Sequence, residues 1–230
     1  MTPVLVLLFR VHPATAIGTD LLYAAVTKAA GTVMHGAAGT VDWRLTARLA
    51  AGSVPATIAT LFLLRHFGIN GGRIAPLLTH ALGAALLLTA ICLIFRPHLL
   101  AWGAKHFADP GPRVARILTV ATGAALGILV SLSSVGAGAI GVTALLLLYP
   151  RLPLGRIVGS DIAHAVPLTL VAGAGHWVLG SVDLALLLSL LTGSIPGIVL
   201  GSRMATRVPE SILRQILATV LVLVGGRLLA

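Results

Sequence analysis

The sequence predicts an all-α, polytopic helical membrane protein, and its composition and its apolar runs both favour this fold class. Of the 230 residues, 57% are hydrophobic and 10% are charged, whereas a soluble domain carries about 25% charged residues. A water-soluble fold of this size would not have enough polar residues to cover its surface. The mean hydropathy of +1.03 agrees, and apolar runs near the ~20 residues needed to cross a bilayer recur along the chain. We therefore expect a bundle of helices embedded in a lipid bilayer.

Seven apolar segments are predicted to span the membrane. They cover residues 14–37, 44–65, 73–96, 116–134, 157–180, 183–204 and 211–229. A shorter apolar segment, 139–149, follows the glycine-rich sequence SSVGAG at 133–138, so we expect the chain to be broken or re-entrant there. Residues 1–9 lack the basic start of a signal peptide and are too short to be one. We interpret them as the end of a longer element.

An internal repeat organises these segments. A displacement of 141 residues aligns 12 identical residues over residues 18–55 without a gap. The polar, glycine and proline matches are the informative ones, because apolar composition alone produces matches of Leu and Ala. They pair Gly18, Asp20, His35, Gly39, Val41, Asp42, Gly52, Ser53 and Pro55 with Gly159, Asp161, His176, Gly180, Val182, Asp183, Gly193, Ser194 and Pro196. Internal duplication is characteristic of secondary transporters.

We divide the chain into a first repeat (1–96), a joint (97–115) and a second repeat (116–230). The joint belongs to the most polar connection of the chain, where three prolines are expected to stop helices. The displacement leaves no first-half partner for residues 133–141, so the first repeat is N-terminally incomplete in this interpretation. We expect either roughly 20–35 codons upstream of Met1 that encode an apolar segment ending in Gly-x-Gly, or a chain shortened in evolution.

The basic residues indicate how the two repeats are oriented. If residues 116–149 enter and leave the membrane by the same side, each repeat has three full spans and the repeats are inverted. Basic residues then divide 11 against 4 between the two sides, whereas a single broken crossing would give parallel repeats and a division of 7 against 8. The positive-inside rule favours inverted repeats with the joint in the cytoplasm.

Ionisable residues inside the predicted spans are candidates for function, because they are costly in a bilayer. Asp20 and Asp161 are repeat mates near the start of equivalent helices, where a carboxylate either caps the helix or takes part in transport. His164 lies three residues after Asp161 on the same helical face. The pair could relay protons, or the histidine could simply be hydrogen-bonded within the bundle. Lys28 lies well inside a span and either meets an anionic substrate or extends toward the interface.

Matched interruptions of the two repeats point to a site near the middle of the membrane. Pro55 and Pro196 fall in the middle of equivalent spans, and Gly136–Gly141 permits a turn before a helix whose free N–H groups can hold an anion. Asp42 and Asp183 lie at span boundaries and are expected to cap the following helices. We expect the substrate to be bound by Lys28, Ser134, Gly136, Gly138, Gly141, Pro55 and Pro196, with Asp20, Asp161 and His164 coupling proton movement.

Several other classes of protein are disfavoured. The net charge is +10, but the basic residues lie singly or in pairs between apolar runs, so they indicate topology and not a nucleic-acid partner. The single cysteine, Cys92, excludes an internal disulfide and a multi-cysteine metal site. The sequence contains no HExxH motif, histidine-rich cluster, Gly-x-Ser-x-Gly elbow or Walker loop. We therefore expect no enzymatic activity, no cofactor and no bound metal, and coupling through an ion gradient or the substrate's own gradient.

The second half resembles the TauE/SafE family of sulfite exporters and related membrane permeases. The resemblance lies in SVGAGAIG, LYPRLPLGRIVGSD, GHWVLGSVD and TGSIPGIVLGSRMATRVPESILR, and the first half is similar to that family's first repeat in HPATAIGTDLLYAAVTK and HGAAGTVDWR. Members usually carry a glycine-rich motif in each half, whereas this sequence has it only at Gly136, Gly138 and Gly141.

The resemblance implies a multi-pass transporter of the inner (plasma) membrane that moves a small anion such as sulfite, an organosulfonate or a related sulfur-containing or organic anion. The partners expected are this anion, the lipid bilayer and, for a homo-oligomer, further copies of the chain. The alternative is a non-transporting membrane partner or scaffold subunit, or a truncated and inactive transporter.

Overall fold

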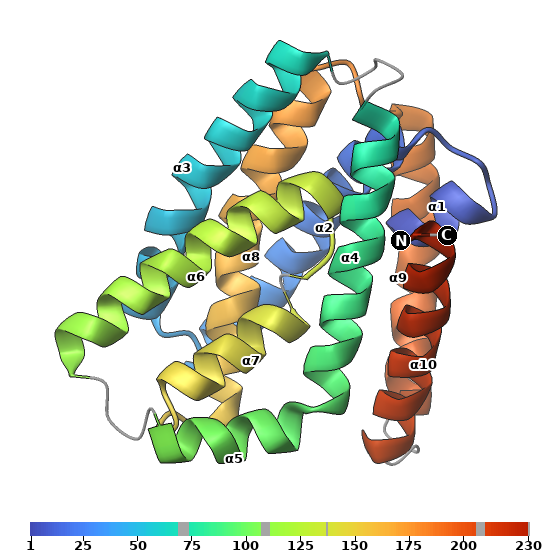
Figure 1. The fold of residues 1–230 in the computed structure, drawn as a ribbon. Coiled ribbons are helices and arrows are strands. Elements are labelled where there is room, and N and C mark those ends of the chain that lie inside the picture. Colours follow the sequence, from blue (N-terminus) through green and yellow to red (C-terminus); the bar gives the residue numbers. More distant parts are fainter. Residues whose placement is uncertain (69–73, 107–110, 137, 206–209, 230) are drawn as a thin grey trace.

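The computed structural model describes residues 1–68, 74–106, 111–136, 138–205 and 210–229, without the side chains of 103–106, 112, 195, 196, 198–205, 210 and 211. Every regular element of the described part is a helix (Figure 1). The helices are α1 (Thr2–Leu7), α2 (Pro13–Ala37), α3 (Trp43–Phe67), α4 (Ile74–Ile94), α5 (Arg96–His106), α6 (Pro112–Ser133), α7 (Ala139–Leu148), α8 (Leu154–Val178), α9 (Leu184–Ala205) and α10 (Glu210–Leu229). The predicted all-α class is confirmed.

Long apolar helices account for the membrane character of the chain. Within the described residues, α3, α4, α6, α8 and α10 are long and apolar enough to cross a bilayer. The two other predicted spans, 14–37 and 183–204, correspond to α2 and α9. α2 is long enough at 25 residues, but Asp20, Lys28 and His35 make it more polar. The polytopic membrane fold is therefore confirmed.

Two short helices were not expected from the sequence. Residues 2–7 form α1, which packs against α2. The polar connection after residue 95 forms α5, although we expected its prolines to stop a helix. Pro97 is the second residue of α5, a position where its missing N–H group is not needed for the hydrogen-bond ladder. Pro112 likewise lies at the start of α6.

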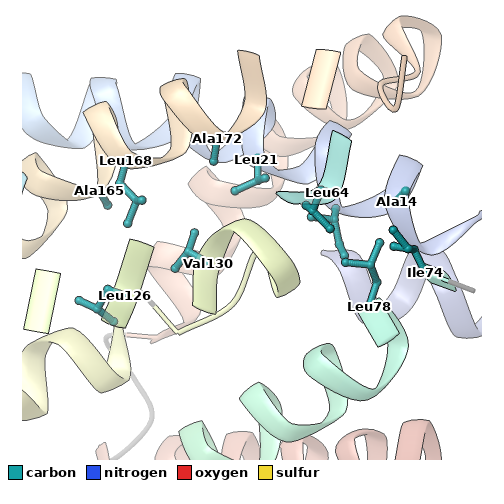
Figure 2. Close-up of a cluster of buried hydrophobic side chains, with 11 residues drawn as sticks. Ala14, Leu21, Leu64, Ile74, Leu78, Leu126, Val130, Ala165, Leu168 and Ala172 are labelled. Atoms are coloured by element: carbon teal, nitrogen blue, oxygen red, sulfur yellow. The ribbon is translucent and has the colours of Figure 1, made fainter. Parts of the chain in front are cut away.

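Three helix pairs build the bundle, namely α2 with α8, α3 with α6 and α4 with α10 (Figure 1). Its main apolar core lies where α2, α3, α4, α6 and α8 meet (Figure 2). The buried residues of this core are Ala14, Ile17, Leu21, Leu64, Ile74, Leu78, Leu126, Val130, Ala165, Leu168 and Ala172. Because lipid tails are as apolar as these side chains, close packing and polar contacts, more than transfer out of water, hold such helices together.

Glycines let the backbones of α3 and α6 touch. A Cβ atom on Gly52 would overlap the carbonyl oxygen of Val120 in α6. In the opposite direction, Cβ atoms on Gly123 and Gly127 would overlap the backbone of Leu49 and Ser53 in α3. Small residues four positions apart are a common way for membrane helices to approach this closely.

The two predicted repeats make reciprocal contacts. Helix α8 begins and ends 141 residues after α2, which is the displacement seen in the sequence. The backbone N–H of Asp42 donates to Ser160 Oγ at 2.8 Å, and that of its mate Asp183 donates to Thr19 Oγ1 at 3.1 Å. Each of these four residues has its repeat mate in the other bond. Such reciprocity is what a twofold relation between repeats requires, while the division of the chain into two repeats and their orientation in a membrane stay predictions.

One pair of repeat mates has unequal surroundings. Gly52 lies against the backbone of α6, whereas no described heavy atom lies within 4 Å of a Cβ atom placed on its mate Gly193. A cavity of about 370 Å³ lies at this place, lined by residues that include Tyr23, Ser194 and Gly197. The face of α9 that corresponds to the α6-binding face of α3 is therefore open in the described part of the chain.

Candidate functional site

The predicted glycine-rich break is present between α6 and α7. Helix α6 ends at Ser133, and Ser134 follows in the left-handed conformation with φ of 57°. Gly136 has φ of 108°, a value that side-chain-bearing residues rarely adopt. Gly138 is the N-cap of α7 and is exposed. The break thus ends one helix and starts another, and it brings Ser134 against α2 and Gly141 against α8.

Asp20 accepts hydrogen bonds from the N-terminal residues and from this break. Its Oδ2 atom accepts from the backbone N–H and the hydroxyl of Thr2, at 2.9 and 2.6 Å. The Met1 amino group and the Ser134 hydroxyl each donate to the same oxygen at 3.1 Å. The hydrogen bonds of Asp20 therefore connect α1 and the break to α2, and its Oδ2 atom accepts from four donors.

The interpretation of Asp20 and Asp161 as caps of their own helices is wrong. Helix α2 begins at Pro13 with His12 as its N-cap, and α8 begins at Leu154 with Pro153 as its N-cap. Both acids therefore lie seven residues inside their helices, beyond the first turn where a cap can act. By contrast, Asp42 and Asp183 do cap α3 and α9, because their Oδ1 atoms accept from backbone N–H groups of the first turns.

Asp161 differs from its mate because no described residue donates a hydrogen bond to its buried Oδ1 atom. Its side chain is 2% exposed, and its Oδ1 atom has no hydrogen-bond partner in the described part of the chain. This oxygen lies against Gly141 in the first turn of α7, where a Cβ atom would overlap it. A buried polar atom without a partner is costly and calls for an explanation, such as a bound ligand, water or proton.

His164 lies next to Asp161 on α8 and is fully buried. Its Nε2 atom is 2.9 Å from the hydroxyl of Ser53 in α3, while its Nδ1 atom has no partner among the described residues. The histidine is thus hydrogen-bonded within the bundle, as one of the two interpretations of the sequence expected. Its second ring nitrogen remains open for a proton or a ligand.

Lys28 faces these groups from α2. It is half-buried, and it interacts electrostatically with Asp161, Asp20 and His164. No described residue forms an ion pair with it, since the described ion pair joins the Met1 amino group to Asp20. A Cβ atom on Gly31, one turn further along α2, would lie 3.3 Å from the Ile162 side chain of α8, so the two helices run close together here.

We call Lys28, Ser53, Gly141, Asp161 and His164 the polar centre. Its members come from α2, α3, α7 and α8, and three of them carry charge or can carry it. Ser53 was not expected in the site. Its identity with its repeat mate Ser194 was the sequence feature that could have indicated it. Among the described residues, no three His, Cys, Asp or Glu side chains gather as metal ligands.

The remaining expected site residues lie elsewhere. Pro55 is exposed on α3, and the helix continues through it. Gly136 is buried against Leu129 of α6, and Ser134 belongs to the Asp20 contact. The side chain of Pro196 lies outside the described residues. A further buried histidine, His176, has its Nε2 atom 3.0 Å from the carbonyl oxygen of Ser131.

Comparison with known proteins agrees with this picture of a helical membrane protein. The family model described as Sulfite exporter TauE/SafE matches residues 1–228. The chain is also 34% identical over 233 residues to the "Probable membrane transporter protein YjnA" of Bacillus subtilis (strain 168), covering 100% of this chain and 90% of that protein. No solved structure matches. Since the family model covers almost the whole chain, this protein belongs to the TauE/SafE family of membrane transporters.

Proposed function

We propose that the protein is a secondary transporter that moves a small anion, such as sulfite, an organosulfonate or a related anion, through the polar centre. Membership of the family and the long apolar helices support transport across a membrane. One observation carries the placement of the site. Asp161 is buried without a donor, beside a lysine that has no ion-pair partner among the described residues.

Lys28 supplies the attraction for the anion. Its ammonium group interacts electrostatically with Asp161 of α8, and a charge acts more strongly inside the bundle, where the dielectric constant is lower than in water. The first turn of α7 adds backbone N–H groups at a helix start, which favour anions. The anion would therefore bind between Lys28 and the start of α7.

Asp161 makes this binding depend on a proton. An ionised carboxylate beside the anion would repel it, whereas a protonated one would offer an O–H donor. We infer that a proton enters with the anion and resides on Asp161. His164, three residues away on the same face, exchanges that proton through its open Nδ1 atom. The net charge carried is then smaller than that of the anion alone.

The test is counterflow of radiolabelled sulfite in proteoliposomes, with a labelled alkylsulfonate in parallel. Lys28→Met keeps the length and the apolar body of the side chain but removes its charge, so we expect it to insert normally and lose most exchange. Lys28→Arg is the matched control and should retain exchange, since it keeps the charge. Wild-type rates in Lys28→Met would show that Lys28 only extends toward the interface and that the site is elsewhere.

A non-transporting membrane partner is the second candidate, and the open face of α9 favours it. The mate of this face on α3 is covered by a helix at backbone contact, so the α9 face has the shape to take a helix as well. If the folded protein exchanges no anion while a cysteine at position 193 cross-links to another membrane protein, the partner function is supported instead.

A further inference from the structure

A second groove lies between the C-terminal halves of α3 and α8, which pack side by side (Figure 1). It has a volume of about 330 Å³. Its walls are mainly aliphatic and aromatic, with Ile58, Leu61 and Phe62 from α3 and Val171 and Val178 from α8. One charged residue, Arg65, also lines it. The groove therefore combines an apolar wall with a single cation.

The position of the cation is that of a membrane interface. Arg65 lies in the last turn of α3, before the C-cap Gly68, and Trp177 lies in the last turn of α8 with 54% of its surface exposed. Tryptophan and arginine at helix ends mark the level of the lipid headgroups. The apolar wall extends from there toward residue 58, that is, back along the helices into the level of the acyl chains.

The guanidinium group of Arg65 has no ion-pair partner among the described residues. The residue is exposed. An uncharged apolar ligand would leave this cation unmatched, and a small free anion would make no use of the apolar wall. The ligand that satisfies both is amphiphilic, with an anionic head and an apolar tail.

We propose that this groove binds an anionic phospholipid, with the phosphate group at Arg65 and one acyl chain along Leu61 and Val171. The arginine fork pairs with phosphate oxygens in two parallel hydrogen bonds. The acyl chain fills the space between α3 and α8. The site is separate from the polar centre, and its occupancy does not depend on the transported substrate.

A larger cavity on the opposite face of α3 provides an internal comparison. It has a volume of about 630 Å³ and is lined by apolar residues such as Leu63, Phe67 and Leu132, and none of its described lining residues is charged. Acyl chains can enter it, but its described lining has no charged group that would distinguish one headgroup from another. Of these two described cavities, the groove that contains Arg65 is therefore the one where headgroup selectivity is expected.

The experiment measures retained lipid by native mass spectrometry after reconstitution in nanodiscs of equal phosphatidylglycerol and phosphatidylcholine. The wild type should retain phosphatidylglycerol preferentially. Arg65→Gln should reduce this preference about fivefold, the effect of one basic residue at an anionic lipid surface. Arg44→Gln, at the exposed start of the same helix, is the control and should keep it.

Two further variants separate groove binding from general attraction of anionic lipid. Ala174→Phe fills the groove from α8 and should lower phosphatidylglycerol retention, whereas Ala59→Phe fills the larger cavity and should not. Circular dichroism confirms that all four variants are folded. Equal retention of the two lipids by the wild type, or an unchanged preference in Arg65→Gln, would overturn the proposal and leave only the ordinary lipid annulus.

Discussion

The repeat mates Gly52 and Gly193 allow one substitution to be made in two surroundings. In α3, a methyl group on Gly52 would overlap the carbonyl oxygen of Val120 and lie 2.8 Å from the backbone nitrogen of Ala124. Both obstacles are backbone atoms of α6, so no side chain can rotate away to make room. The helices must separate, which also weakens the contacts of Gly123 and Gly127 with α3.

The two substitutions are expected to change the free energy of unfolding in opposite directions. Overpacking of this kind costs about 1–3 kcal/mol, so Gly52→Ala should lower the free energy of unfolding by at least that amount. A methyl group on Gly193 meets no described heavy atom within 4 Å. Gly193→Ala should therefore keep the helix-propensity gain of about 1 kcal/mol. The two variants should differ by about 2–4 kcal/mol.

Unfolding by dodecyl sulfate in lipid–detergent micelles, followed by far-ultraviolet circular dichroism, measures both free energies under one condition. We expect the unfolding midpoint of Gly52→Ala to fall and that of Gly193→Ala to stay level or rise. Equal losses in the two variants would mean that α9 is covered as closely as α3, and the open face described above would not exist in the folded protein.

Two other matched pairs test the polar centre. Gly141→Ala should abolish anion counterflow because its methyl group displaces the Asp161 carboxylate. Gly138→Ala should keep counterflow because its methyl group meets no described heavy atom within 4 Å. Equal counterflow in the two variants would refute the contact between Gly141 and Asp161. Asp20→Asn should cost about 1–3 kcal/mol of stability, because a carboxylate oxygen that accepts four hydrogen bonds is replaced. Asp161→Asn should cost little stability and should remove the pH dependence of exchange; a large loss of stability instead would show that Asp161 is structural.

The helices could be predicted because long apolar runs and their boundaries are local properties of the sequence. The starts of α3 and α9 are marked in the sequence by the capping residues Asp42 and Asp183. The break between α6 and α7 is marked by a run of small residues, two of which, Ser134 and Gly136, have positive φ angles in the structure. Helix α5 was missed because a proline at a helix start looks, in sequence, like one that stops a helix. Its tertiary contacts with α7, and not its local pattern, favour the helix.

The site could be predicted only in part, because residue identity does not reveal which partners a side chain meets. Asp20 and Asp161 are equivalent in the alignment, yet Thr2 supplies donors to one, whereas the buried Oδ1 atom of the other lies against Gly141 and has no donor among the described residues. Pro55 was expected in the site as an interruption of the helix, but it points outward. Ser53, two residues earlier and therefore on nearly the opposite face, is the one that contacts the centre.

The reciprocal contacts between the repeats also determine when the protein can finish folding during its synthesis. The hydroxyl of Thr19 can accept its hydrogen bond only after Asp183, which lies 164 residues later in the chain, has been synthesised. At ribosomal rates of about 5–20 residues per second, this interval is on the order of ten seconds or more. Helix α2 is thus synthesised well before α8, the helix that packs against it, and before Asp183, which bonds to Thr19. The helix bundle therefore stays incompletely packed in the membrane for that time. Separately expressed halves of the chain should assemble only when both are present in the same membrane.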